Sequence, residues 1–362
     1  MNDHVSTLLT DNSVIVVAGS GGVGKTTVSA ALAVRAAESG RRVAVVTIDP
    51  ARRLADALGL GGSIGNEPVR IALPSAPGEL WAIMLDTRST FDALVDRYSP
   101  SAEQAERIRS NLFYKNISGA LSGTQEYMAA EKLYELHGDP RFDLVIVDTP
   151  PTRQALDFLG APARLRRFID HPLYRVVIAP SHLGLKAVNA AAQPVLRTIG
   201  RVVGARALDD ALAFFRAFQG LDAGFRERAH QVDRVLHEEA TRYVVVASAQ
   251  PEPVDEAIHF IDELERQNVS VSLVIANRLV PDFVGAVDRA NNPADLLANL
   301  DELVAERTTE ERVLVRLAKR AADAAFARVG VVTDLIDPSA RADAAGTLET
   351  LSQLGSLIRV GG

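Results

Sequence analysis

A glycine-rich loop close to the start of the chain limits the folds that this sequence can adopt. Residues 19–27 read Gly-Ser-Gly-Gly-Val-Gly-Lys-Thr-Thr, and they lie between the β-branched run 14–17 and an alanine-rich, helical segment, 26–39. A glycine, four residues and Gly-Lys-Thr between a strand and a helix form the pattern of a phosphate-binding loop. A glycine-rich turn that binds no nucleotide is the alternative interpretation. The presence of both flanking elements favours the phosphate loop.

The residue types of this loop suit the phosphates of a nucleotide such as ATP. Glycines leave the backbone N–H groups free to converge on the β-phosphate, and the start of the following helix adds partial positive charge. Lys25 is expected to reach the β and γ oxygens and to act in catalysis, and the Thr26 hydroxyl is expected to hold Mg²⁺. The residues predicted to bind ATP here are Gly21, Gly22, Val23, Gly24, Lys25, Thr26 and Thr27.

Further β-branched runs recur along the chain and predict the fold class. They are mostly continuous rather than alternating, as expected for strands of a parallel sheet that is buried on both faces. Helical stretches separate them, among them 256–267 with apolar residues at helical spacing. This alternation predicts an α/β fold, a doubly wound, mostly parallel P-loop NTPase sheet in a single ATPase domain spanning 1–362. The runs are 43–46, 144–147, 243–246 and 271–275.

Two stretches interrupt the alternation and predict an inserted helical subdomain. They are 101–137 and the arginine-rich 163–242, whereas 329–335 is expected to be an edge segment and 344–358 a helix. Two apolar stripes at helical spacing run through the second stretch. They either pack on each other or on the sheet, or they contribute to a groove or interface for a partner. The stripes are Val188, Ala191, Val195, Ile199 and Val202, and Leu208, Ala211, Phe215 and Phe218.

Two acidic residues follow expected strands and are candidates for the chemistry of the site. Asp148 ends one strand and precedes Thr149-Pro150-Pro151-Thr152, a rigid loop suited to sensing the γ-phosphate. A terminal Asp can be only a helix cap, but its combination with a phosphate loop favours a place in the Mg²⁺ site. Asp49 ends the strand 43–48, at the edge where an open α/β sheet places its ligand, and it could orient the attacking water. Capping of the following helix is the alternative for Asp49.

The composition argues against several other classes of function. A net charge of −7 gives no reason to expect binding to a nucleic acid, and the absence of cysteine excludes disulfides and thiolate zinc sites. The start of the chain, 1–13, lacks the basic and apolar parts of a secretory signal. No apolar run approaches the roughly 18 residues that span a bilayer. We therefore expect a cytoplasmic protein that binds neither zinc nor nucleic acid.

Four segments together resemble one family, that of the arsenite-pump ATPases and the ATPases that target tail-anchored proteins. The loop has the form of the family's deviant Walker A motif. Two more segments are similar to its first and second switches, and the fourth is similar to the segment whose Asn binds adenine. The resemblance spans about 13–280, and its segments besides the loop are 47–51 with 54–57, 143–152 and 274–278.

This resemblance implies an activity and a set of roles. It implies an ATP-hydrolysing enzyme in which Asp49 activates the water, Asp148 belongs to the Mg²⁺ site and Asn277 contacts the adenine. Members of the family work as dimers that close around ATP, and hydrolysis moves helical subdomains that hold a client. The catalytic residues implied here are therefore Asp49 and Lys25, and the metal-site residues are Thr26 and Asp148.

The chain departs from the family pattern at two points. Family loops usually carry a lysine directly after the first glycine, which reaches the partner's nucleotide, whereas this chain carries Ser20. Either hydrolysis is slow, or another group replaces the lysine, or a Lys-bearing paralogue supplies it across a heterodimer, as in a similar paired type of actinobacterial anion-transporting ATPase. The chain also has no cysteine and only three methionines, so the zinc clasp, the metalloid thiols and a Met-rich client groove are not expected.

Three hypotheses for the function follow. The first is a dimeric nucleotide switch that uses ATP hydrolysis to move or deliver a protein or membrane-protein client through its helical subdomain. The second is the ATPase subunit of an anion or metalloid transport system. The third is a weakly hydrolysing regulatory subunit that pairs with a Lys-bearing paralogue, as an alternative to a homodimer.

Overall fold

The chain forms two compact units, one built on a β-sheet and one built of helices. The sheet unit comprises Met1–Leu85, Glu135–Leu156 and His237–Gly362, and the helical unit comprises Asp86–Tyr134 and Asp157–Leu236. The helical unit thus has other bounds than the stretches 101–137 and 163–242. The computed structural model describes residues 4–49, 53–60, 64–74, 76–115, 123–172, 204–279, 300–321, 324–330 and 344–358.

The sheet unit confirms the doubly wound, mostly parallel sheet. The described residues form an eight-stranded sheet with the order β3-β4-β2-β5-β1-β6-β7-β8. Neighbouring strands pair in parallel, except that β3 is antiparallel to β4. The strands are β1 Val14–Gly19, β2 Arg42–Thr47, β3 Val69–Ile71, β4 Glu79–Met84, β5 Leu144–Asp148, β6 Thr241–Ser248, β7 Val271–Leu279 and β8 Ala325–Gly330.

The position of β1 explains where a ligand can bind. It lies between β5 and β6, and all of its residues are buried, as its continuous β-branched sequence predicts. In the strand order, the chain runs from β1 toward one edge of the sheet, on the side where β2 lies. It later passes from β5 to β6, which lies on the other side of β1, toward the opposite edge. The carboxyl ends of β1, β2 and β5 therefore meet at a topological switch point, where open α/β sheets bind their ligands.

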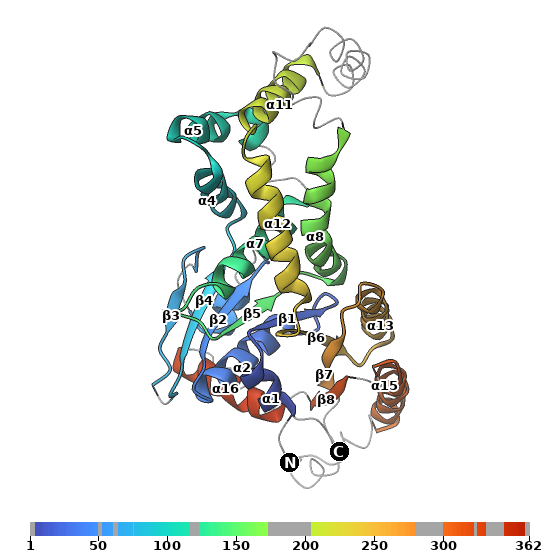
Figure 1. Ribbon diagram of the computed structural model, residues 1–362. Coiled ribbons are helices and arrows are strands. Elements are labelled where there is room, and N and C mark those ends of the chain that lie inside the picture. Colours follow the sequence, from blue (N-terminus) through green and yellow to red (C-terminus); the bar gives the residue numbers. More distant parts are fainter. Residues whose placement is uncertain are drawn as a thin grey trace. The chain divides into compact units, whose positions relative to one another are not determined.

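Six helices of the described sheet unit cover the sheet. Figure 1 shows α1, α2 and α16 grouped together, with α13 and α15 next to β6, β7 and β8. The Arg35 guanidinium of α2 donates to the carbonyl oxygens of Gly355 and Ile358 at 2.9 and 2.8 Å, which fixes the end of α16 to α2. The helices are α1 His4–Asp11, α2 Lys25–Glu38, α3 Arg53–Ala57, α13 Pro251–Arg266, α15 Leu300–Arg320 and α16 Ala344–Leu357.

Several elements differ from the expectation. Helix α1 and strands β3 and β4 were not predicted, and α13 begins at Pro251 rather than at residue 256. Strand β8 begins at Ala325, four positions before the expected edge segment 329–335, whose residues 331–335 lie outside the described part. Pro251 occupies the first turn of α13, where a missing N–H is tolerated, so the helix extends further toward its N-terminus than its apolar spacing indicates.

The helical unit has an aromatic core. Phe91, Tyr114, Phe214, Phe218 and Phe225 are buried there, and adjacent ring centroids lie 4.8–6.3 Å apart. The apolar stripe 208–218 packs into this aromatic core through Phe218. The stripe 188–202 lies outside the described residues. The helices that contribute to this unit are α4 Thr87–Tyr98, α5 Ala102–Ser110, α7 Thr124–His137, α8 Thr152–Asp170, α11 Ala205–Ala217 and α12 Asp222–His237.

A buried ion pair joins two of these helices. Arg228 of α12 donates from Nε to both carboxylate oxygens of Glu131 on α7, at 2.8 and 3.0 Å. The two side chains are only 9% and 3% exposed, and the guanidinium lies 3.9 Å from the centre of the Tyr134 ring. Such a pair is well satisfied as it stands, but removal of one partner leaves an uncompensated buried charge.

We expect Glu131→Gln to lower the free energy of unfolding of the helical unit by about 3–5 kcal/mol, because Arg228 then stays charged without its counterion. Urea unfolding followed by circular dichroism measures the change. The matched control is Glu106→Gln, which breaks an exposed pair with Arg109 and should change stability by less than about 1 kcal/mol. Equal effects of the two variants would contradict the prediction.

Candidate active site

The glycine-rich loop joins β1 to α2 in a conformation that requires glycine at two positions. Gly19 has φ 155°, and a Cβ there would collide with the Val246 carbonyl oxygen on β6. Gly24 has φ 95°, precedes α2, and a Cβ there would collide with the Asn277 amide. At Gly21 and Gly22 an added Cβ would meet no described atom within 4 Å. The loop is therefore closely packed at its ends and open at its middle, as a cradle for a ligand has to be.

The first turn of α2 offers unpaired N–H groups to that open space. The first backbone bond of the helix runs from Val28 N to Gly24 O at 2.9 Å, and no side chain of the described residues caps its N-terminus. The N–H groups of Lys25, Thr26 and Thr27 consequently carry the positive end of the helix dipole without an internal acceptor. An anion at this position would satisfy them.

Lys25 is folded over its own loop. The side chain is only 8% exposed, and Nζ donates to the Ser20 carbonyl oxygen at 2.8 Å. Burial lowers the pKa of the Lys25 ammonium, and the nearby Asp148 carboxylate opposes that shift. The poorly hydrated Lys25 ammonium would therefore favour the binding of an anion in the cradle.

Asp148 and Thr26, the two residues predicted to hold a metal, lie in contact. Asp148 Oδ2 accepts hydrogen bonds from Thr26 Oγ1 at 2.7 Å and from Thr47 Oγ1 at 3.1 Å. Oδ1 is buried and has no hydrogen-bond partner within the described ranges. Burial raises the pKa of Asp148 to about 6, against the effect of both hydroxyls. A carboxylate with an unsatisfied oxygen beside a hydroxyl fits a hard divalent cation such as Mg²⁺.

Asp49 lies just beyond β2, at the same edge of the sheet. Its carboxylate is 24% exposed and forms an ion pair with Arg53 Nη1 at 3.4 Å. Helix α3 begins at Arg53, so Asp49 contacts the helix through that side chain. The geometry leaves the carboxylate at the cavity wall, where it can orient a water molecule, and its catalytic role stays a prediction.

Asn277 is fixed against the loop from β7. Its Nδ2 donates to the Val23 carbonyl oxygen at 2.8 Å. The amide therefore positions the loop directly, and its contact with adenine stays a prediction. The next residue, Arg278, also lines the cavity and was not selected from the sequence as a site residue. Only its place in the Asn277-Arg278 segment could have indicated it.

These residues surround one cavity of about 960 Å³ in the sheet unit. The switch segment 54–57 contributes the wall on α3, whereas the wall on α16 was not predicted, because that helix is more than 300 residues away from the loop along the chain. The cavity is lined by Gly21, Gly22, Gly24, Lys25, Thr26, Thr27, Asp49, Arg53, Asp56, Ala57, Gly59, Leu60, Thr149, Pro150, Pro151, Arg278, Thr347, Thr350 and Leu351.

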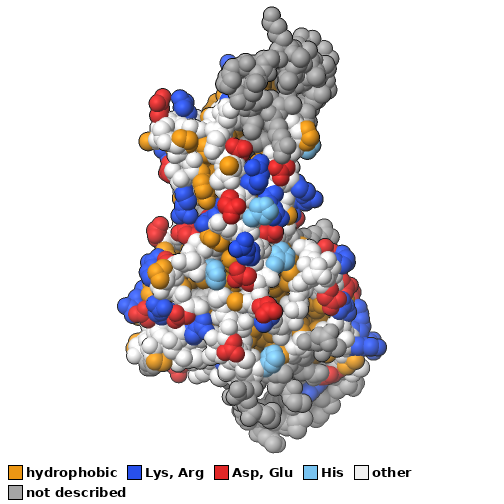
Figure 2. All heavy atoms as spheres, in the orientation of Figure 1, with side chains coloured by type: hydrophobic (Ala, Val, Ile, Leu, Met, Phe, Trp, Pro, Cys, Tyr) orange, Lys and Arg blue, Asp and Glu red, His pale blue; other side chains and the backbone are white. Residues whose placement is uncertain are grey.

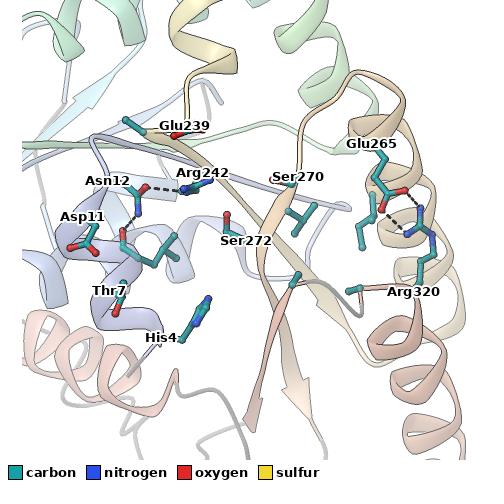
Figure 3. A pocket seen from close by; sticks show the side chains of 16 residues that line it. His4, Thr7, Asp11, Asn12, Glu239, Arg242, Glu265, Ser270, Ser272 and Arg320 are labelled. Atoms are coloured by element: carbon teal, nitrogen blue, oxygen red, sulfur yellow. Dashed lines mark hydrogen bonds and ion pairs between the residues drawn. The ribbon is translucent and has the colours of Figure 1, made fainter. Parts of the chain in front are cut away.

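A second cavity, of about 790 Å³, lies at the opposite ends of β6 and β7 (Figure 3). Its arginines are already engaged: Arg320 pairs with Glu265 at 2.6 Å, and Arg242 donates to Asn12 at 3.1 Å. On the face drawn in Figure 2, acidic and basic side chains are interspersed. The first cavity provides a local attraction for an anionic ligand through Lys25 and the N-terminus of α2.

The described residues contain no group of three or more His, Cys, Asp or Glu side chains that could hold a metal ion. A metal at Thr26 and Asp148 would thus take its remaining ligands from phosphates and water. None of the helices in the described ranges combines the length and the apolar character that crossing a membrane requires.

A glycine cradle can be tested by adding one methyl group. We expect Gly24→Ala to weaken ATP binding by at least about tenfold, because Cβ meets the Asn277 amide and the left-handed backbone is strained. Gly40→Ala is the control, since Gly40 has φ 94° but an added Cβ there meets no described atom within 4 Å. Calorimetry measures the ATP affinity of both variants, and a normal affinity in Gly24→Ala would contradict this geometry.

A phosphate loop at the switch point of a mostly parallel sheet, with a carboxylate at the end of a neighbouring strand, defines the class of P-loop nucleotide-hydrolysing enzymes. Within that class the chain belongs to the anion-transporting ATPase family, whose model matches residues 12–290. The protein is an ATPase, and the family resemblance drawn from the loop, the two switch segments and the segment 274–278 is confirmed.

Individual relatives support this assignment. The chain is 27% identical to ATPase GET3 of Malassezia globosa over 72% of its own length and 71% of the relative. It is 25% identical to a protein of Prosthecochloris vibrioformis named as an arsenical pump-driving ATPase, over 72% of its own length and 60% of that protein. It is 33% identical to Protein Rv2184c of Mycobacterium tuberculosis, over 48% of its own length and 43% of that protein.

Proposed function

We propose that this chain binds Mg-ATP on loop 19–27 and hydrolyses it with a water molecule that Asp49 activates. The contact between Thr26 and Asp148 carries the proposal, because it leaves one buried carboxylate oxygen unsatisfied beside an open glycine cradle. An unsatisfied buried acceptor is unfavourable by roughly 1–3 kcal/mol, and a bound cation would relieve that penalty.

Each residue has a task in this proposal. Lys25 Nζ leaves the Ser20 carbonyl for the β and γ oxygens, and the N–H groups of the loop bind the β-phosphate. Thr26 and Asp148 would hold Mg²⁺, which neutralises phosphate charge when bound. Asp49 orients a water oxygen toward the γ-phosphorus, so that the bond to ADP breaks and inorganic phosphate leaves.

Calorimetric titration of the purified chain tests the binding step. ATP is expected to bind in the presence of Mg²⁺ and to bind much more weakly after chelation of the metal, and phosphate release should follow the same dependence. The absence of any heat of binding with ATP and Mg²⁺, from protein whose circular dichroism shows it to be folded, would contradict the proposal.

We infer further that the nucleotide controls a dimer and, through it, a client. Asp49 and Asp56 belong to the segment that resembles the family's first switch, and both line the cavity. A change at the γ-phosphate therefore acts directly on that segment. The helical unit, with its aromatic core, is the part that would hold a protein or membrane-protein client.

Sedimentation velocity tests the dimer. A homodimer is expected to form with ATP and to dissociate with ADP. If ATP produces a dimer only after a Lys-bearing paralogue is added, the heterodimer and the regulatory-subunit hypothesis are favoured instead. A monomer in every nucleotide state, with and without the paralogue, would overturn the switch.

Transport of an anion or metalloid is a second candidate, supported by the family description and by the relative named as an arsenical pump-driving ATPase. Arsenite or antimonite should then stimulate turnover. The absence of cysteine leaves no thiol to bind them, so we expect no stimulation. A severalfold increase would favour the transport subunit over client delivery.

A further inference from the structure

Arg278 is the cationic residue of the nucleotide cavity that has no partner within the described residues. Among the described residues that line the cavity, three carry a cationic side chain: Lys25, Arg53 and Arg278. Lys25 donates to the Ser20 carbonyl, and Arg53 pairs with Asp49. Arg278 is exposed at the cavity wall, and no hydrogen bond or ion pair to another described residue engages it. Its guanidinium is therefore available to a ligand.

The backbone at Arg278 is unusual for a strand. Its φ is 60°, in the left-handed region that arginine rarely adopts. The pairing of β7 with β8 shifts at the same place, since Ala276 pairs with Arg328 but Leu279 pairs with Gly330. This irregularity inserts one extra residue into β7. Bulges of this kind redirect side chains, and strain retained at a cavity wall indicates a functional constraint.

The neighbouring residue ties this bulge to the phosphate loop. Asn277 Nδ2 donates to the Val23 carbonyl oxygen at 2.8 Å, and the same amide lies against Gly24. The backbone that carries Arg278 is thus held beside the loop that binds phosphate. Guanidinium groups suit phosphate oxygens because they can donate two parallel hydrogen bonds.

We propose that Arg278 is a nucleotide-binding residue whose guanidinium contacts the polyphosphate of ATP from within the same chain. This assignment rests on the proposed Mg-ATP site. It adds a second cation to Lys25 and matches the charge of a triphosphate better than Lys25 and the helix dipole alone. The other possible partner of this guanidinium is the adenine, which a stacked arginine could also contact.

The variant Arg278→Asn removes the charge and keeps a residue type that tolerates the left-handed backbone. We expect it to raise the dissociation constant of Mg-ATP by about ten- to hundredfold and to make that constant less sensitive to salt. The affinity for adenosine should stay unchanged, and Arg278→Lys should restore part of the ATP affinity. Arg70→Asn on β3, an exposed arginine outside the cavity, is the matched control.

Calorimetry with ATP, ADP and adenosine gives a decisive result. If Arg278→Asn binds ATP as tightly as Arg70→Asn does, the assignment is overturned. If ATP and adenosine are weakened equally, the residue acts on the base or on the loop, and the polyphosphate contact is wrong. Failure of the unchanged protein to bind Mg-ATP would instead remove the proposed function itself, so the two failures are distinguishable.

Discussion

The variant Lys25→Met should lose at least about two orders of magnitude in affinity for Mg-ATP. The Lys25 side chain is only 8% exposed. A charge-assisted hydrogen bond from its ammonium to a phosphate is stronger in such surroundings than in water. Methionine keeps the unbranched side chain and much of its volume. The expected loss of ATP affinity is therefore due to the missing charge and not to a cavity left by a smaller side chain.

Thermal unfolding with and without nucleotide measures this effect. ATP at one hundred times its dissociation constant should stabilise the unchanged protein by about 2.7 kcal/mol and should leave Lys25→Met almost unaffected. Lys319→Met on α15, where the lysine is exposed, is the control and should respond to ATP like the unchanged protein. Normal stabilisation of Lys25→Met by ATP would show that the loop is not the nucleotide site.

Asp49→Asn is expected to lower the rate of hydrolysis by about 10²–10⁴-fold and to change ATP affinity by only a few fold. The amide keeps the size of the side chain but cannot accept a proton from the attacking water. Its ion pair with Arg53 is also lost, but that pair is partly exposed and contributes little to stability.

Single-turnover phosphate release measures the chemical step for Asp49→Asn. Asp56→Asn is the matched control, because Asp56 lines the same cavity from α3 and is not proposed to contact the attacking water. An Asp49→Asn rate equal to that of Asp56→Asn would remove Asp49 from catalysis. If the nucleotide controls a dimer, Asp49→Asn should also remain an ATP-bound dimer for longer than the unchanged protein does. Sedimentation velocity measures the lifetime of that dimer.

Local sequence patterns were sufficient for the centre of the sheet and for the loop. The runs of β1, β2, β5, β6 and β7 are continuous and β-branched because those strands are buried on both faces, so their pattern is unambiguous. Asp148 and Thr26, 122 residues apart, could be assigned to one Mg²⁺ site in advance because a phosphate loop needs an acidic residue at the end of a buried strand.

Edge elements carried a weaker signal. Strand β3 has three residues, and two of them are exposed. So short a segment shows no alternation of apolar and polar residues that could predict a strand. Helix α1 has only three buried residues, and they lie among polar neighbours. The overall polarity of this segment therefore hid its helical pattern. The backbone of Arg278 and the pairing of Arg53 with Asp49 depend on tertiary packing, and no spacing in the sequence encodes them.

Arg35 anchors the far end of the chain to the helix that begins at the phosphate loop, while Thr347 and Thr350 of α16 face the same cavity. Gly355 packs so closely on Ala31 that any larger side chain would push the two helices apart. A larger side chain at Gly355 would therefore also move the threonines at the cavity wall, so a substitution more than 300 residues from the phosphate loop could change nucleotide affinity.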